Sequence, residues 1–206
     1  MNNIPKYAKA LATIAIVLCI TTSTFAHDIE VDNIFYKIKD NTAQTVSVTY
    51  HSLVSKDDSY KYSGDILIPA SITHNETTYT VTGIDSDAFN KCENLTSVSI
   101  PNTVTEIGRY AFYYCTKLSS VSIPNTVTTI NYATFAGCSN LPSITIPNSV
   151  TTICSTAFYG CSSLKGIIIP DSVKAIDHCA FAFTEQGIPI TRDKTTSANE
   201  LIINTN

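Results

Sequence analysis

A 23-residue unit recurs through the centre of the chain, and this repeat restricts the fold more than any other feature of the sequence. The unit reads L-x-x-V-x-I-P-x-x-V-x-x-I-x-x-x-A-F-x-x-C-x-x and is complete in the stretch that begins at Leu95. Five kinds of residue keep the spacing: Pro101, Pro124, Pro147 and Pro170; Cys92, Cys115, Cys138 and Cys161; Leu95, Leu118, Leu141 and Leu164; Phe89, Phe112, Phe135, Phe158 and Phe181; and Ile84, Ile107, Ile130, Ile153 and Ile176. A fixed period in this range predicts a solenoid, in which stacked units bury their apolar side chains against one another.

Each unit has three parts with different expected structures. Residues 96–100 alternate small polar with apolar side chains, so they are expected to form a strand, which Pro101 ends because proline cannot donate to a ladder. Residues 103–107 are expected to form an extended bend. The third part is expected to be a short helical turn, capped in the first coil by Asp85. The predicted fold class is an α/β solenoid of leucine-rich-repeat type, with a parallel β-sheet on one face and helical turns on the other.

The chain is expected to divide into four segments. They are a signal peptide at 1–26, an N-terminal β cap at 27–62 with a hairpin, a solenoid of about five coils at 63–186, and a tail at 187–206. The first coil carries a small hairpin insert near 70–80, read either as a binding loop or as extra capping. The tail is read either as a weak cap or as disordered.

The first 26 residues have the pattern of a secretory signal. Lys6 and Lys9 precede an uncharged apolar run of 11 residues at 10–20, and small residues precede the expected cleavage after Ala26. A membrane span needs about 20 apolar residues, so a retained anchor is disfavoured, as is lipidation at Cys19, which follows a leucine. Secretion or display at the cell surface is therefore expected, with no membrane span after cleavage.

The charge and the scattered polar residues exclude several classes of function. The net charge is −4 and falls to −6 without the signal peptide, because Lys6 and Lys9 leave with it, so nucleic acid is an unsuitable partner. Paired C-x-x-C zinc motifs, phosphate-binding loops and hydrolase motifs are absent from the sequence. No metal site, cofactor site or catalytic residue is therefore predicted, and the chain is not expected to be an enzyme. Asp177, His178 and Cys179 are adjacent, but neighbouring residues on a helical turn point apart.

The cysteines of the repeat occupy a position that suits a small buried side chain, so they are expected to be buried thiols. Cys154 and Cys179 lie outside that series, and a disulfide between adjacent coils stays open for them. Cys154 also occupies the expected helix-cap position, which would lower the pKa of its thiol.

The repeat resembles the BspA-type leucine-rich-repeat proteins, through its phased proline, Ala-Phe, cysteine and leucine positions over about 63–186. The segment VDNIFYKI…YSGDILIP is also similar to the leader found before such repeats. The resemblance implies a curved solenoid and adhesion of a surface or secreted protein to host or bacterial partners. It implies no catalytic residues.

The strand residues that alternate with the buried ones form the expected binding face. They are Ser97, Ser99, Ser120, Ser122, Ser143, Thr145, Gly166 and Ile168. Stacking would align them in two columns on the concave sheet, suited to an extracellular protein or glycan. A second interpretation is that these serines and threonines are merely soluble strand formers. The tyrosines of the turn segments are a weaker candidate for sugar stacking. The alternative for the whole chain is a structural spacer or display module without a ligand of its own.

Overall fold

The computed structural model describes residues 26–51, 61–184 and 190–192, which are built from strands and turns. Within these ranges no residue is helical, and no segment could cross a membrane as an apolar helix. Residues 1–25 of the expected signal peptide lie outside them, as does most of the expected tail.

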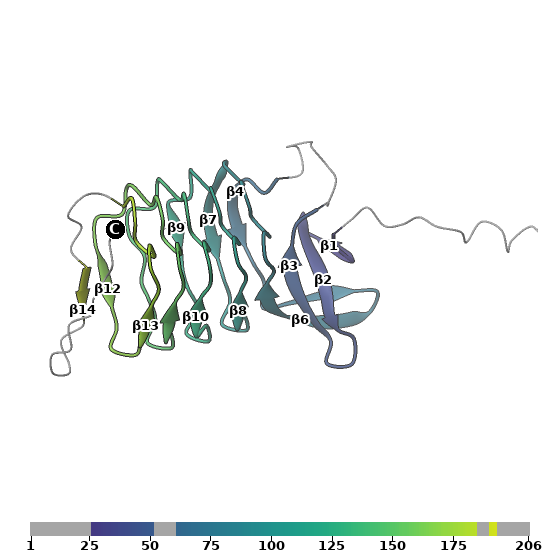
Figure 1. Ribbon diagram of the computed structural model, residues 1–206. Helices are drawn as coiled ribbons and strands as arrows, with labels where there is room; N and C mark the ends of the chain where they lie inside the picture. Colours follow the sequence, from purple (N-terminus) through teal and green to yellow (C-terminus); the bar gives the residue numbers. More distant parts are fainter. Residues whose placement is uncertain (1–25, 52–60, 185–189, 193–206) are drawn as a thin grey trace, which may run out of the picture.

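The N-terminal segment forms a sheet that continues into the first coils. Its strands are β1 (Ile29–Val31), β2 (Ile34–Asp40), β3 (Thr45–Thr49), β5 (Ser71–His74), β6 (Thr77–Ile84) and β8 (Glu106–Ile107). β1, β2 and β3 pair antiparallel, and β5 pairs antiparallel with β6 across the expected insert. β6 also pairs parallel with β3 on one side and with β8 on the other. The long strand β6 therefore joins the N-terminal segment to the stack (Figure 1).

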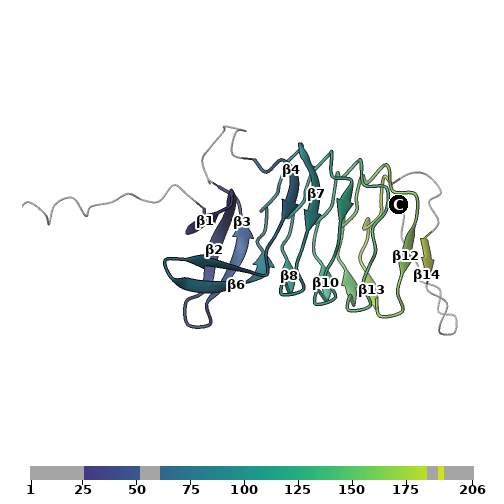
Figure 2. The same ribbon diagram turned by 180° about the vertical axis from the view of Figure 1, so that it is seen from behind.

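The coils are joined by two parallel ladders that run along the stack (Figures 1 and 2). The first contains β4 (Gly64–Leu67), β7 (Leu95–Ser99) and β9 (Ser120–Val121), followed by a separate pair, β12 (Ile167–Ile169) and β14 (Ile190–Arg192). The second contains β10 (Thr129–Ile130), β11 (Thr152–Ile153) and β13 (Ala175–Ile176). Thr129 pairs with Thr152, and Thr152 with Ala175, so each step follows the 23-residue period. The stretch expected to be an extended bend thus contributes a ladder of its own.

The third part of each coil consists of consecutive turns, and the expected helical turns are not formed among the described residues. Two residues per coil have a positive φ, such as Asp87 at 62° and Lys91 at 55°. Alternate N–H groups of the segment then donate to the following coil, while those of Ala88 and Asn90 donate within the segment. The N–H of Phe89 donates to the carbonyl of Ala111 at 2.8 Å, and the N–H of Phe112 donates to Thr134 at 2.8 Å. Every second backbone donor of the segment, which a helix would use internally, therefore holds adjacent coils together.

The core is a set of columns that run along the stack. The phenylalanine rings stack almost in parallel, with centroids 5.0 Å apart for Phe89 and Phe112 and 5.5 Å for Phe135 and Phe158. Each repeat cysteine lies beside this column. The Sγ of Cys138 donates to the carbonyl of Phe112 at 3.2 Å. A small side chain with a weak donor satisfies a buried carbonyl at this position without widening the stack.

The aromatic column continues beyond the repeats into the N-terminal segment. The Tyr62 ring lies 4.7 Å from that of Phe89 and 5.6 Å from that of Phe35. Its hydroxyl donates to the carbonyl of Thr49 at 2.7 Å and accepts from the N–H of Phe35 at 2.9 Å. Tyr62 is 6% exposed, so one side chain both packs against the first repeat and satisfies polar groups of the N-terminal segment.

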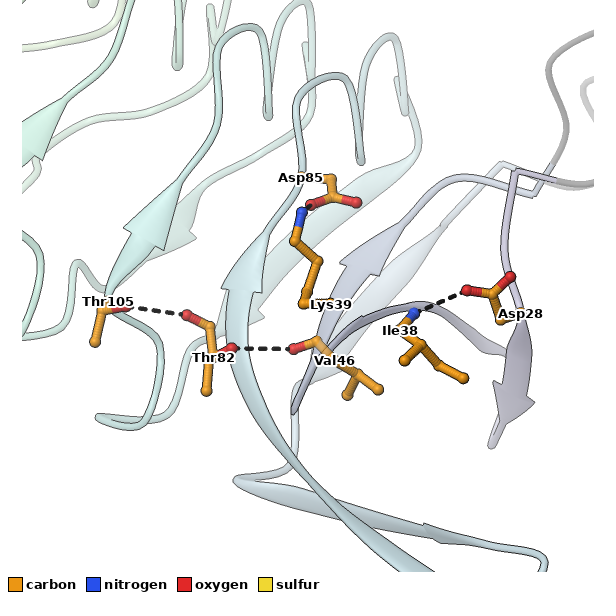
Figure 3. A network of polar contacts seen from close by, with 7 residues as sticks. All are labelled: Asp28, Ile38, Lys39, Val46, Thr82, Asp85 and Thr105. Atoms are coloured by element: carbon orange, nitrogen blue, oxygen red, sulfur yellow. Dashed lines mark hydrogen bonds and ion pairs between the residues drawn. The ribbon is translucent and has the colours of Figure 1, made fainter. Parts of the chain in front are cut away.

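Side chains reinforce the junction between the N-terminal segment and the first coil (Figure 3). Lys39 Nζ lies 3.2 Å from a carboxylate oxygen of Asp85, and the hydroxyl of Thr82 donates to the carbonyl of Val46 at 3.5 Å. The ion pair is largely exposed, and such pairs contribute only up to about 1 kcal/mol. The parallel pairing of β3 with β6 and the burial of Tyr62 are the main attachments.

Candidate binding face

Four of the eight predicted face residues lie on strands of the first ladder: Ser97 and Ser99 on β7, Ser120 on β9, and Ile168 on β12. Ser97 pairs with Ser120 between β7 and β9, while Asp65 and Leu67 of β4 pair with Ser97 and Ser99. Ser97 and Gly166 are half-buried, and the other six predicted residues are exposed. Asp65 and Leu67 therefore extend the two columns at their N-terminal end. The sequence analysis missed them because the insert places β4 out of phase with the 23-residue period.

Hydroxyl groups elsewhere in the stack mostly serve to hold neighbouring coils together. Several of them donate to a carbonyl in the preceding coil: Thr105 to Thr82, Ser119 to Thr96, Thr126 to Val104, Ser149 to Val127, and Thr151 to Thr128. These bonds repeat at 22 or 23 residues. The high serine and threonine content is thus partly structural.

The hydroxyls of the predicted face differ from this pattern. Ser97 donates to Asp65 at 2.6 Å, and Thr96 donates to the same oxygen at 2.7 Å. Hydrogen bonds from Ser97 and then Thr96 hold the pKa of Asp65 below its usual value. Within the described part of the chain, no hydrogen bond engages the remaining face hydroxyls, those of Ser99, Ser120, Ser122, Ser143 and Thr145. Five exposed hydroxyls are therefore available to a partner.

A groove of about 540 Å³ lies over the C-terminal half of this face. It is lined by Asn125, Ser143, Ile144, Thr145, Ile146, Pro147, Asn148, Gly166, Ile168 and Pro170. Gly166 ends the first column, which contains Ser97, and provides no side chain there. Ile168 ends the second column, which contains Ser99, and provides a large side chain that is 61% exposed. The groove thus contains four of the eight predicted face residues.

The first ladder is interrupted beside the groove. Residues 143–146 belong to no strand, and between them and the described coils on either side no backbone hydrogen bond forms. Ile144 and Ile146 are nevertheless 8% and 5% exposed. Apolar burial therefore holds this segment in place, while its backbone polar groups are not engaged in the ladder.

The turn side carries a second surface feature, a cluster of aromatic rings. Tyr110 contacts Tyr113 and Tyr132 in edge-on arrangements with centroids 5.4 Å and 5.2 Å apart, and Tyr113 contacts Tyr114 at 4.6 Å. The Tyr114 ring lies against Gly137, whose φ is 76° and where an added Cβ would come within 2.9 Å of the ring. A side chain at Gly137 would therefore displace this ring, whereas the positive φ alone is adopted by Lys91 and Tyr114 at the equivalent positions. The rings are mutually inclined and form no common flat platform.

The repeat cysteines are buried thiols, as predicted. Burial raises the pKa of Cys92 and of Cys161 to about 12, and raises the pKa of Cys115 and Cys138 as well. Cys154 and Cys179 are thiols rather than a disulfide. The prediction that the pKa of Cys154 is lowered is wrong, because burial raises this pKa and the charge of Asp177 raises it further. A helix cap cannot lower this pKa where no helix forms.

We expect the repeat cysteines to be unreactive in the folded protein. At pH 8 a thiol whose pKa is raised by burial carries almost no thiolate, which is the reactive form. Ellman's reagent should therefore leave Cys92, Cys115, Cys138 and Cys161 unmodified in native protein and modify them in guanidinium chloride. Rapid native labelling of Cys138, located by peptide mass, would contradict the buried column.

The adjacent Asp177, His178 and Cys179 lie at the start of the turn segment of the last described coil. Asp177 and His178 are exposed, and Cys179 has a φ of 56°. Ser155 Oγ lies 3.4 Å from His178 Nε2, but it donates to the carbonyl of His178 at 2.9 Å. The described residues also include no cluster of histidine, cysteine and carboxylate side chains that could hold a metal ion.

Comparisons with known proteins agree with this architecture. A family model for the BspA type leucine-rich repeat region matches residues 68–186 in 6 copies. Among curated proteins no similar sequence was found.

Three solved structures are similar to this chain. A leucine-rich repeat protein from Bacteroides ovatus is 33% identical, with a TM-score of 0.70, and the match covers 80% of this chain and 41% of that one. One from T. pallidum is 27% identical, with a TM-score of 0.63 and coverage of 75% and 66%. One from Bacteroides capillosus is 32% identical, with a TM-score of 0.56 and coverage of 68% and 95%. The chain thus spans less than half the length of the Bacteroides ovatus protein. Since the family's repeat accounts for more than half of the sequence, the chain belongs to the BspA-type leucine-rich repeat family.

Proposed function

We propose that this chain is a secreted or cell-surface protein that binds an extracellular protein or glycan through the face formed by the first ladder, without catalysis. The observation that carries the proposal is the set of five exposed hydroxyls that make no hydrogen bond within the described residues. Serine and threonine on the ladder face would be expected to bond between coils if their role were structural, as Thr105 and Ser119 do. Membership of a family with surface proteins supports the location.

The shape of the face also supports binding. Solenoids present extended surfaces along their parallel sheets, where one side chain per coil repeats at a regular spacing. The hydroxyls each donate one hydrogen bond and accept others, so the columns match a partner with mixed donors and acceptors. Asp65 is the charged residue at the N-terminal end of the first column, and the groove residues are uncharged.

A paired substitution tests the face. A binding partner is first identified by probing residues 27–206 against extracellular-matrix proteins and a glycan array. Ser120→Arg combined with Ser143→Glu should then reduce that binding at least about tenfold, because it places two bulky charges on the columns. Both sites are exposed, so the stability should change by no more than about 0.5 kcal/mol.

The turn side provides the matched comparison. Tyr113→Ala combined with Tyr114→Ala removes two rings of the aromatic cluster and leaves the ladder face unchanged. If binding survives the serine pair but is lost with the tyrosine pair, recognition belongs to the turn side. If no extracellular partner responds to either pair, the chain fits a spacer or display module instead.

A further inference from the structure

We propose that the groove over residues 143–170 binds an extended, uncharged peptide segment and places one aliphatic side chain of that segment against Ile168. This inference rests on the proposed function and selects protein rather than glycan as the partner. It assigns the groove a chemical class of ligand and a position for one side chain.

The lining of the groove favours an uncharged partner. None of its ten residues is acidic or basic. A charge brought into such a groove would lose hydration without finding an opposite charge, which is unfavourable. Neutral hydrogen-bonding groups meet suitable counterparts in the hydroxyls of Ser143 and Thr145 and in the side-chain amides of Asn125 and Asn148.

The apolar part of the lining favours a peptide over a sugar. Ile168 is 61% exposed and is accompanied by Pro147 and Pro170, so the apolar surface is aliphatic. No aromatic residue lines the groove, whereas the flat apolar faces of sugar rings stack well on aromatic rings. An aliphatic side chain would instead gain free energy by covering the exposed part of Ile168.

The spacing of the polar groups matches an extended main chain. Ser143 and Thr145 are alternate residues, and in extended backbone alternate residues lie about 6.6–6.8 Å apart. Alternate peptide groups of a bound extended segment have the same spacing, so a segment lying along residues 143–146 would meet both hydroxyls. Residues 143–146 lie in a coil with neighbours on both sides, so the segment would meet the exposed side chains of this stretch rather than its backbone.

The test uses synthetic peptides with the full chain. The probes are acetylated, amidated nonapeptides of randomised Ser, Thr, Asn and Gln, with Val, Leu, Trp, Ser, Asp or Lys at the centre. Binding is measured by fluorescence polarisation, with a neutral oligosaccharide panel in parallel. Peptides with central Val or Leu should bind at least about tenfold more tightly than those with Asp, Lys or Ser.

Matched variants locate the side chain. Ile168→Ser should reduce binding of the Val and Leu peptides about tenfold, and Ile168→Val should restore most of it. Phe183→Ser is the control, because Phe183 is 75% exposed, lies on the turn side and does not line the groove. It should leave binding unchanged. Thermal unfolding of Ile168→Ser should match that of Phe183→Ser, which separates lost contact from lost folding.

The outcomes distinguish this inference from the proposed function. Equal binding of charged and aliphatic peptides, or equal effects of Ile168→Ser and Phe183→Ser, would overturn the groove assignment. So would binding of neutral oligosaccharides alone, or of no peptide. In these cases the proposed function would still stand if the Ser120→Arg and Ser143→Glu pair abolished binding of the extracellular partner. If the serine pair of substitutions left binding of that partner unchanged, the proposed function itself would be overturned.

Discussion

Replacing Phe135 with alanine is expected to lower the free energy of unfolding by about 3–5 kcal/mol. Its ring is fully buried and stacked on both faces, with the Phe112 centroid at 5.3 Å and the Phe158 centroid at 5.5 Å. Truncation leaves a cavity in the middle of the column, and stacked coils on either side cannot close it without breaking their ladder bonds. Chemical denaturation followed by circular dichroism measures the loss.

Phe181→Ala provides the comparison within the same column. Phe181 is 4% exposed, and among the described rings it stacks on Phe158 alone, at 5.3 Å. It also lies in the last described coil, where fewer neighbours depend on it. We expect a smaller loss than at Phe135. Equal losses at the two sites would show that the C-terminal coil is held as firmly as the centre.

Replacing Tyr62 with alanine is expected to destabilise the protein by at least about 4 kcal/mol, because it combines a cavity with lost hydrogen bonds. The ring joins Phe35 to Phe89, and the hydroxyl serves both the N–H of Phe35 and the carbonyl of Thr49. The main consequence should be separation of the N-terminal segment from the first coil. Hydrogen exchange should show faster exchange in β2 and β3 than in β10 and β11.

Tyr62→Phe isolates the hydroxyl from the ring. The ring contacts stay, but the N–H of Phe35 and the carbonyl of Thr49 lose a buried partner, which costs about 1–3 kcal/mol. If Tyr62→Phe costs as much as Tyr62→Ala, the hydroxyl rather than the ring attaches the N-terminal segment. If neither change affects exchange in β2 and β3, Tyr62 does not couple the two parts.

The proposed site was only partly visible in the sequence. The two columns followed from the alternation of buried and exposed residues in each repeat. The groove did not, because it depends on how Gly166 and Ile168 face the unpaired segment 143–146. The role of Asp65 as acceptor for Ser97 was also hidden, since the two residues are brought together across the insert.

The sequence by itself determined the coil period, the buried columns and the family, because a 23-residue spacing places equivalent side chains above one another. The pairing of Thr129 with Thr152, for example, follows directly from that spacing. Only the tertiary structure decided the third part of the coil. There the apolar spacing suited a helix, but the N–H groups of Phe89 and Phe112 bond to the following coil. The tertiary structure alone also decided the position of Tyr62. It lies 27 residues before Phe89, outside the 23-residue period, yet its ring extends the phenylalanine column. A backbone donor takes whichever acceptor lies nearest in the folded stack, and that choice depends on neighbours that a single repeat does not contain.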